Sequence, residues 1–454
     1  MSTTARPPVP VHATATGSPG PMPPAPRLPR LAQTAGFMFG GARFLDAVQR
    51  RYGDVVTLHT LFDDTFVMIF DPALVKQVFQ GPGERLRAGE ANALLGPIVG
   101  ERSVLLLDGA EHLRHRRLML PAFHGQRMLA HAETMRASAD AEIDAWPVRE
   151  PFALLPSMQA LTLRVILRAV FGYTPGPAED ELRRRMRAMI EPLSHRRGLV
   201  MIAAVIRGRG NTRAARAFTA RRRAVQELLE AEIARRRSDP DLPRHDDVFS
   251  ALLLARDEAG DGLSDAEVRD ELMTLLLAGH ETTATGLAWT FDLLLHDARV
   301  VGRAADGDDR YLDAVVKESL RRRPVIAGVG RVVRGAPFPI GRYEVPVGIE
   351  INPAIRTIHR RADLYPEPGR FLPERFLGAD PPDTYAWIPF GGGARRCLGA
   401  SFALMEMRVV LARVLERCAL RAVDRKPTTA QFRTITLAPK SGVRVIQDRP
   451  PAAA

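Results

Sequence analysis

The sequence predicts a mainly α-helical protein with small β-sheets, an α+β chain in which helices dominate. Three observations support this prediction. A helical pattern starts at a capping box, Ser264 to Glu267, and continues to about residue 296, a length of about 45 Å at 1.5 Å per residue. Residues 130–172 and 179–239 are also helix-rich. The clearest strands are short, residues 55–58 and 66–69 around an Asp-Asp turn.

Bulk composition indicates a globular intracellular protein. The chain has 454 residues, of which 46% are hydrophobic and 26% are charged, so a sizeable core is available. Two cysteines in a chain of this length argue against a disulfide framework and fit a reducing compartment, so we expect a cytoplasmic protein. The net charge of +12 is compatible with nucleic acid, an anionic membrane surface or an acidic protein. Because the arginines form no nucleic-acid-binding motif, we favour the acidic protein and expect no nucleic-acid partner.

The two ends of the chain differ in composition from the part between them. Residues 1–30 contain nine prolines and no signal-like apolar run, which predicts a flexible Pro-rich segment. Residues 31–447 are expected to form one domain, and 448–454 a short tail. An apolar stretch at 198–206, between arginines, is too short to span a bilayer and could be a lid or a buried helix. No transmembrane anchor is predicted.

One of the two cysteines lies in an unusual loop. Cys397 follows three consecutive glycines and two arginines, and a helical pattern continues from residue 398 to about 417. Free N–H groups and the dipole at a helix N-terminus favour a thiolate. A single thiolate cannot build a zinc or iron–sulfur site, but it can be the one protein ligand of a haem iron. The alternative is a buried structural cysteine in a glycine-rich turn.

The long helix contains an abrupt polar insertion in its apolar sequence. Ala278 and Gly279 would allow a flat group to approach the backbone, and Thr282 can bond the carbonyl group of Ala278 and loosen the helix. A buried Glu281 needs a partner or a function. These residues predict a groove with a proton carrier beside it, and the alternative is a kink of structural origin.

These motifs together resemble those of the cytochrome P450 family, over about residues 31–447. The cysteine segment resembles its haem-ligand loop, Phe-x-x-Gly-x-Arg-x-Cys-x-Gly, and residues 278–283 resemble its oxygen-activation motif. The resemblance implies a triangular, helix-rich single domain with haem b between the long central helix and the cysteine-loop helix. It also implies Cys397 as the axial iron ligand and Glu281 and Thr282 as catalytic residues. The implied haem contacts of the two segments are Ala278, Gly279, Phe390, Gly393, Arg395 and Gly399.

Further cofactor contacts are implied at positions that could hold the haem propionates. His112 and Arg116 are four residues apart and so share a helical face, where two donors could bind a carboxylate. The resemblance assigns them this role, together with Arg331 and His359. A basic solvated helix is the alternative for the first pair, and a metal site from His112 and His115 lacks a further ligand.

Other segments are expected to have structural or substrate-binding roles. The resemblance implies a buried ion network of Glu318, Arg321 and Arg375 that holds the cysteine loop. Residues 325–329 and 434–437 would line an apolar substrate pocket. Cys418 is interpreted as a core residue.

The resemblance implies a monooxygenase of the soluble bacterial type, expected to be a monomer. It would insert one oxygen atom from O2 into an apolar small molecule, by hydroxylation or epoxidation. Electrons would come from NAD(P)H through a ferredoxin reductase and an acidic ferredoxin, which would dock near Arg395, Arg396 and Arg408. A peroxide-driven peroxygenase and a non-catalytic haem protein that senses a gas are the alternatives.

Overall fold

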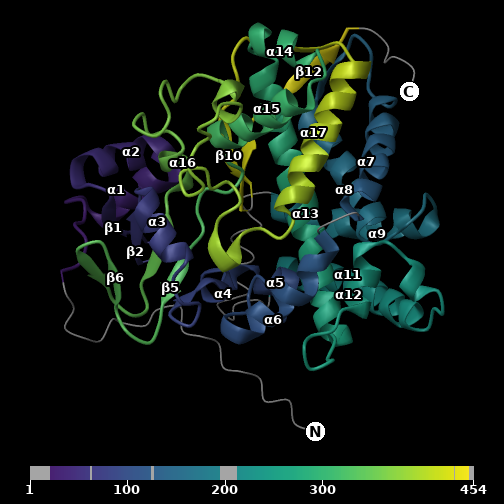
Figure 1. The fold of residues 1–454 in the computed structure, drawn as a ribbon, viewed down its shortest axis with the longest axis horizontal. Helices are drawn as coiled ribbons and strands as arrows, with labels where there is room; N and C mark the ends of the chain where they lie inside the picture. The colour runs from purple at the N-terminus through teal and green to yellow at the C-terminus, as the bar shows by residue number, and fades with distance from the viewer. Residues whose placement is uncertain (1–20, 62–63, 124–126, 195–211, 434, 449–454) are drawn as a thin grey trace.

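The computed structural model describes residues 21–61, 64–123, 127–194, 212–433 and 435–448. The predicted lid at 198–206 and Thr434 lie outside these ranges. A sheet-bearing part contains the helices of residues 30–79, and a helix-rich part contains the helices of residues 127–190 and 400–417 (Figure 1). The mainly α architecture with small sheets is confirmed.

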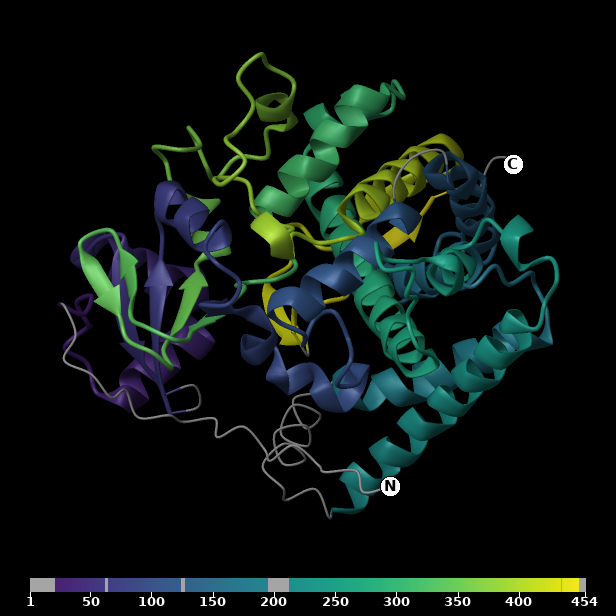
Figure 2. The same ribbon diagram turned by 60° about the horizontal axis from the view of Figure 1, so that its bottom comes forward.

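The long helix is confirmed as α13, Asp265–Leu294. The Ser264 side chain accepts from the Glu267 backbone N–H, and the Glu267 carboxylate accepts from the Ser264 N–H, so the capping box is complete. Around α13 lies the largest core cluster, formed with apolar residues of several helices. Figure 2 shows α13 among these helices, which are α8 (Leu154–Ala169), α11 (Arg213–Arg237), α15 (Asp309–Arg322) and α17 (Ala400–Arg417).

The remaining helices are shorter, except for α7 and α9. Asp71 caps α3 by accepting from the N–H groups of Ala73 and Leu74, with Pro72 in the first turn. The α-helices are α1 (Arg30–Ala35), α2 (Gly41–Tyr52), α3 (Pro72–Phe79), α4 (Ala88–Ala91), α5 (Gly96–Val99), α6 (Gly109–Met119), α7 (Arg127–Ile143), α9 (Pro177–Ile190), α12 (Val248–Leu254), α14 (Ala298–Ala304) and α16 (Ile355–Ile358). A π-helix, η1 (Gly36–Gly40), joins α1 to α2, and the 3₁₀ turns used below are η4 (Glu191–Ser194), η6 (Pro373–Phe376) and η7 (Gly393–Arg395).

The principal sheet has five strands in the order β1-β2-β8-β5-β3. The predicted strand pair is confirmed, because β1 and β2 are antiparallel with Val55 opposite Ile69. Strand β8 runs parallel to β2, so a crossover connects distant parts of the chain. The strands are β1 (Val55–His59), β2 (Thr65–Ile69), β3 (Leu86–Arg87), β5 (Arg331–Val333) and β8 (Glu350–Pro353), and the smaller sheets contain β4 (Pro151–Ala153), β6 (Phe338–Ile340), β7 (Tyr343–Val345), β9 (Leu420–Ala422), β10 (Ala430–Arg433), β11 (Thr436–Pro439) and β12 (Arg444–Gln447).

The described part of the Pro-rich segment lies against the sheet. The carbonyl group of Pro24 accepts from the Thr57 N–H at 2.9 Å, and that of Pro23 accepts from the Thr57 hydroxyl at 2.9 Å. Proline has no N–H to leave unpaired, so such a segment can cover a sheet edge through its carbonyl groups alone. The chain is therefore attached to the fold from Pro21 onward, although the sequence suggested a flexible lead up to residue 30. Among the described helices, none has the length and hydropathy needed to cross a bilayer.

A buried carboxyl group in α17 leads to a stability prediction. Glu406 is fully buried, neither of its carboxylate oxygens has a hydrogen-bond partner among the described residues, and burial raises the pKa of its carboxyl group well above the usual range. The folded protein therefore binds a proton that the unfolded chain releases above about pH 4.3. Stability is lost as pH rises from that value toward the raised pKa, and Glu406→Gln removes this loss.

We expect the Glu406→Gln variant to be more stable than the wild type at pH 8 by more than about 1 kcal/mol. The advantage should shrink toward pH 4, where the wild-type carboxyl group is protonated in both states. Urea unfolding at the two pH values measures this difference. Glu133→Gln, at a side chain that is 80% exposed, is the control and should show no such pH dependence. An equal advantage at both pH values would contradict the proposed titration.

Candidate active site

The cysteine loop is a tight turn that packs on α3. Gly391 and Gly393 have φ of +66° and +62°, a region that favours glycine, and a Cβ atom at Gly393 would collide with the Phe79 backbone. The Cys397 N–H donates to the carbonyl oxygen of Phe390 at 3.0 Å and closes the loop, and α17 begins three residues later. The predicted need for these glycines is explained by this backbone geometry.

The Cys397 thiol faces accessible space inside the protein. Its surface is exposed, yet surrounding protein atoms desolvate it and raise the pKa of the thiol. Both observations hold if the side chain faces interior space enclosed on most sides by protein. The Gly399 N–H and the charges of Arg116 and Arg396 act in the opposite direction and favour the thiolate. Within the described ranges, no group of three or more His, Cys, Asp or Glu residues could hold a metal ion.

One face of α13 is accessible although most of this helix is buried. Ala278 is exposed, and Leu275 and Thr282 are half-buried, whereas Leu276 and His280 on the opposite side are buried. Positions 275, 278 and 282 share a helical face. The Thr282 hydroxyl donates to the Ala278 carbonyl oxygen at 2.6 Å, which is the bond that the sequence predicted. The accessible stripe thus carries a hydroxyl group and one residue with a minimal side chain.

Gly279 lies where α13 packs closely against α8. A Cβ atom there would lie 2.6 Å from the Ile166 Cδ1 atom of α8. The missing side chain therefore allows α8 and α13 to pack closely. A cofactor contact at Gly279 stays a prediction.

Glu281 has partners on two other elements. Its Oε2 atom accepts from the Gln159 Nε2 atom of α8 at 2.6 Å, and its Oε1 atom lies 3.7 Å from the Arg433 Nε atom of β10. The sequence indicated that a buried carboxylate needs a partner, but it did not reveal these two residues. Neither lies in a motif, and only the fold brings them to α13.

Four cationic or imidazole side chains converge beside the cysteine loop. They are His112 and Arg116 of α6, Arg331 of β5, and Arg395 of η7. Burial, and after it the charges of the three arginines, lower the pKa of His112 to about 3, so this imidazole is neutral near pH 7. Arg395 donates to the Asp108 Oδ1 atom at 2.5 Å and to the Val104 carbonyl oxygen at 3.1 Å. Arg395 is therefore already engaged by the segment that precedes α6.

Two arginines of this group lack a counter-charge among the described residues. Arg331 is 6% exposed, donates to the Gly330 carbonyl oxygen at 2.8 Å, and lies over the Phe79 ring. Arg116 is also desolvated, which lowers the pKa of its guanidinium group. In the described part of the chain, neither forms an ion pair with a carboxylate. Buried cations without partners are costly. Two propionates beside an accessible thiol would supply the missing charge, so these residues fit haem b.

His359 does not join this group. Its Nε2 atom accepts from the Ile388 N–H at 3.0 Å, and its carbonyl oxygen accepts from the Arg321 Nη1 atom at 2.6 Å. Burial, and after it the charge of Arg321, lower the pKa of its imidazole to about 3. The geometry therefore differs from the predicted propionate contact and assigns His359 to the structural network below the loop.

The predicted ion network is present and buried. The Arg321 Nε and Nη2 atoms donate to the two oxygens of Glu318, both at 2.7 Å, and both side chains are fully buried. The Arg375 Nε atom lies 3.6 Å from Glu318 Oε1. Through His359 and Ile388, and through contact between the Trp387 and Phe390 rings, this network reaches the cysteine loop. Its position agrees with a role in holding that loop.

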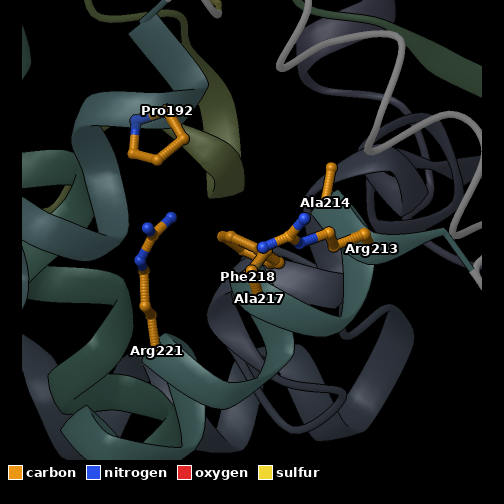
Figure 3. A pocket seen from close by; sticks show the side chains of 6 residues that line it. All are labelled: Pro192, Arg213, Ala214, Ala217, Phe218 and Arg221. Carbon is orange, nitrogen blue, oxygen red and sulfur yellow. The ribbon is translucent and has the colours of Figure 1, made fainter.

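The segments predicted to line a substrate pocket lie side by side. The Leu437 N–H donates to the Val325 carbonyl oxygen at 2.8 Å, which joins β11 to the segment after α15. Cys418 is half-buried and packs against the main core. A separate cavity of about 450 Å³ lies at the start of α11, where Figure 3 shows Pro192 and Arg221 across from Phe218. None of the predicted site residues lines it.

Comparisons with known proteins agree with this site. The family model described as cytochrome P450 matches residues 19–306 and 308–445. Cytochromes P450 135B1 and 137 of Mycobacterium tuberculosis are both 40% identical to this chain, over 93% of it and 91% and 90% of their own lengths. A solved structure of a cyanobacterial CYP120A1 bound to retinoic acid has a TM-score of 0.80 at 24% identity, and the match covers 94% of this chain and 99% of that one.

The family model covers most of the chain, and the relatives are similar over nearly their whole lengths. The fold, the thiol-bearing loop and the polar insertion in α13 are those that the family resemblance implied. The chain therefore belongs to the cytochrome P450 family, whose members are haem b-dependent monooxygenases that use O2 and electrons derived from NAD(P)H.

Proposed function

We propose that this protein hydroxylates or epoxidises an apolar small molecule, with Cys397 as the axial ligand of the haem iron and Thr282 and Glu281 as the catalytic residues. The observation that carries this proposal is the accessible stripe on α13, where the Thr282 hydroxyl follows Ala278 and the Glu281 carboxylate lies beside it. Ala278, Gly279, Phe390, Gly393, Arg395 and Gly399 are proposed to contact the cofactor. We also propose that the catalytic domain spans about residues 31–447 and acts as a cytoplasmic monomer.

The cofactor, when bound, supplies dioxygen activation that a thiolate ligand favours. The chain would hold this group by charge, because the buried Arg331 and the half-buried Arg116 could pair with the propionates and the neutral His112 could donate a hydrogen bond. Arg395 connects the loop to the segment before α6 through Asp108, so it fixes the distance between the two halves of the haem site. The network of Glu318, Arg321 and Arg375 would hold the cysteine loop, and with it the thiol, in place.

Proton supply is the second task of the chain. The Thr282 hydroxyl can exchange its bond to the Ala278 carbonyl oxygen for a bond into the accessible space of the site. Glu281 links that turn of α13 to Arg433, whose side chain is 26% exposed. A carboxylate between a buried site and solvent can carry protons inward one at a time. Gln159 fixes the carboxylate orientation.

Thr282→Val tests the role of the hydroxyl group. The change keeps the side-chain shape and removes the donor, so electrons should be consumed without product, with peroxide released instead. We expect the yield of product per NAD(P)H to fall by about tenfold or more. Thr290→Val is the matched control, because the Thr290 hydroxyl makes the same type of bond to Gly286 on the same helix but is fully buried. Equal coupling in both variants would contradict the proposed role of Thr282.

The substrate class is proposed from the residues that border the site. Val325, Leu437 and the partly buried apolar residues around them offer few polar groups, so we propose an apolar substrate. A spin-state screen of the purified holoprotein against fatty acids, terpenoids, sterols and aromatic polyketides would identify the class that enters. Product formation with NAD(P)H and redox proteins must follow for the best binder. Product formation with peroxide alone at a higher rate would favour a peroxygenase instead.

We propose an acidic ferredoxin as the electron donor, docking on the cysteine-loop side. Of the arginines considered from the sequence, Arg395 is bound to Asp108, and Arg408 is 2.5 Å from an Asp309 oxygen and 3.3 Å from an Asp313 oxygen. Arg396 is exposed and has no ion pair within the described ranges, and the same is true of Arg117 on α6. These two arginines are therefore available to bind a partner.

Replacing Arg117 by Gln should weaken ferredoxin binding through loss of this attraction. We expect the KM for ferredoxin to rise about fivefold at low salt with kcat little changed, and the difference should fade as added salt screens charges. Arg223→Gln is the control, since this arginine on α11 is 79% exposed and lies on a different helix. A wild-type KM that does not change with ionic strength would argue against an electrostatic docking site.

A further inference from the structure

Exposed apolar side chains gather in one short segment at the start of the described chain. Of the eleven large hydrophobic residues that are exposed in the described ranges, four lie between residues 28 and 39 and a fifth is Leu61. Leu31 and Phe39 have the highest exposed fractions, 68% and 74%. Single exposed apolar residues are common, but a group of them marks an interaction surface. The five residues, here called the apolar patch, are Leu28, Leu31, Met38, Phe39 and Leu61.

The helix that carries the patch has its polarity reversed. In the run formed by α1 and η1, Gln33 and Thr34 are 2% and 6% exposed, whereas Leu31, Ala32, Ala35, Met38 and Phe39 face solvent. These outward positions are spaced as one face of a helix. A surface helix of a globular protein normally has the opposite arrangement, with polar residues outside. The outward apolar face therefore needs an explanation outside the core.

Specific bonds fix this orientation. The Gln33 Nε2 atom donates to the Leu28 carbonyl oxygen at 2.9 Å, and its Oε1 atom accepts from the His59 N–H at 2.9 Å. The Leu61 N–H donates to the Thr34 hydroxyl oxygen at 3.0 Å. Both buried polar side chains are thus bonded to the chain at the end of β1. These bonds also place the backbones of Leu28 and Leu61 next to α1.

The π-helical turn controls what its aromatic residues contact. Phe37 turns inward and packs edge-on against Phe66, with ring centroids 5.3 Å apart. The next two residues, Met38 and Phe39, point outward and are 44% and 74% exposed. A π turn shifts the helical register by one residue and is frequent at functional sites. Here it adds two large apolar side chains to the outward face.

Arginines outnumber acidic residues in the segment that carries most of the patch. Residues 27–51 contain five arginines and one acidic residue, Asp46, which lies 3.5 Å from Arg360. Arg27 and Arg43 are exposed, and neither forms an ion pair with another described residue. Arg30 pairs with Asp64 at 2.6 Å. An outward apolar face with arginines at its border is the arrangement of helices that lie in the interface of an anionic bilayer.

We propose that the apolar patch binds the surface of an anionic lipid bilayer, with Leu31 and Phe39 inserted among the acyl chains and Arg27 and Arg43 near the headgroups. A second copy of the chain fits less well. A two-fold contact would bring the basic border of each copy against that of the other, and a stable dimer needs about 800 Å² on each partner. Figure 1 shows α1 and α2 at the edge of the molecule opposite α7 and α9, where a planar surface can reach them. The proposal does not depend on the oxidation reaction.

Flotation of the full-length holoprotein with lipid vesicles tests the proposal. The wild type should float with vesicles that contain phosphatidylglycerol and should bind pure phosphatidylcholine vesicles at least about tenfold more weakly. Added salt should weaken the binding. The double variant Leu31→Gln/Phe39→Gln should lose binding by about tenfold or more. Both residues are exposed, so haem content and circular dichroism should stay as in the wild type.

Two matched variants separate the patch from other surfaces. Leu254→Gln, at a residue on α12 that is 39% exposed, should float like the wild type. Arg43→Gln should weaken binding to the anionic vesicles while leaving the weak binding to phosphatidylcholine unchanged. The proposal is overturned if the wild type does not float with anionic vesicles, or if the double variant floats as well as the wild type. It is also overturned if the wild type is a dimer that the double variant dissociates and neither binds lipid.

Discussion

Replacing Cys397 by Ser should abolish the thiolate-type spectrum of the reduced carbon monoxide complex. It should also lower product formation on the order of a hundredfold or more, because a neutral hydroxyl cannot supply the electron density of a thiolate. The fold should survive, since the Cys397 N–H bond to Phe390 does not involve the side chain. Difference spectroscopy of the purified variant, with haem content measured in parallel, checks this result.

Cys418→Ser provides the matched control for that experiment. Cys418 follows α17, is half-buried in apolar surroundings, and has a thiol whose pKa burial raises to about 11. Its replacement should leave the spectrum and the activity unchanged. A Cys397→Ser protein that keeps the wild-type spectrum would refute the ligand assignment. A Cys418→Ser protein that loses this spectrum would indicate that Cys418, and not Cys397, is the ligand.

Replacing Arg321 by Met should destabilise the folded protein by about 3–5 kcal/mol, because the fully buried Glu318 carboxylate would lose its two-bond cation and keep only the Arg375 Nε atom at 3.6 Å. The guanidinium group also donates to carbonyl oxygens of His359 and Pro368, which would lose a partner. The cysteine loop is held through the same residues, so haem should be released more readily. Denaturant unfolding and haem transfer to an acceptor protein measure the two effects.

A double replacement isolates the interaction between the two charges. Glu318→Gln/Arg321→Met removes both charges and should cost clearly less than the sum of the single changes. Arg370→Met is the surface control, because Arg370 pairs with Glu367 with both side chains 59% exposed, and it should cost less than about 1 kcal/mol. Additive single effects would show that Glu318 and Arg321 do not act as a pair.

Local features of this protein could be predicted from its sequence. The bounds of α13 follow from a capping box at one end and a continuous helical pattern, and the structure differs by only about two residues at the other end. The positive φ angles of Gly391 and Gly393 and the bond from Thr282 to Ala278 are local features, although the close approach of Gly393 to Phe79 is not. Such features are encoded within a few positions, so a single sequence reveals them.

Contacts between distant segments could not be predicted in the same way. Asp108 binds Arg395, and Gln159 and Arg433 reach Glu281, only because the fold brings separate elements together. None of these three partners belongs to a motif. Likewise, a histidine before an arginine pair gives no sign that His359 accepts from the Ile388 N–H rather than facing the cation group. The residue types indicated which interactions were possible, but the packing of distant segments determined which partner each side chain binds.

Iron K-edge X-ray absorption of the purified holoprotein tests the central claim most directly, which is that the Cys397 thiolate is the protein ligand of the haem iron. We predict one sulfur atom among the nearest neighbours of the iron in the wild type and in the Cys418→Ser variant, and none in Cys397→Ser. A wild-type spectrum with only nitrogen and oxygen neighbours would contradict the account.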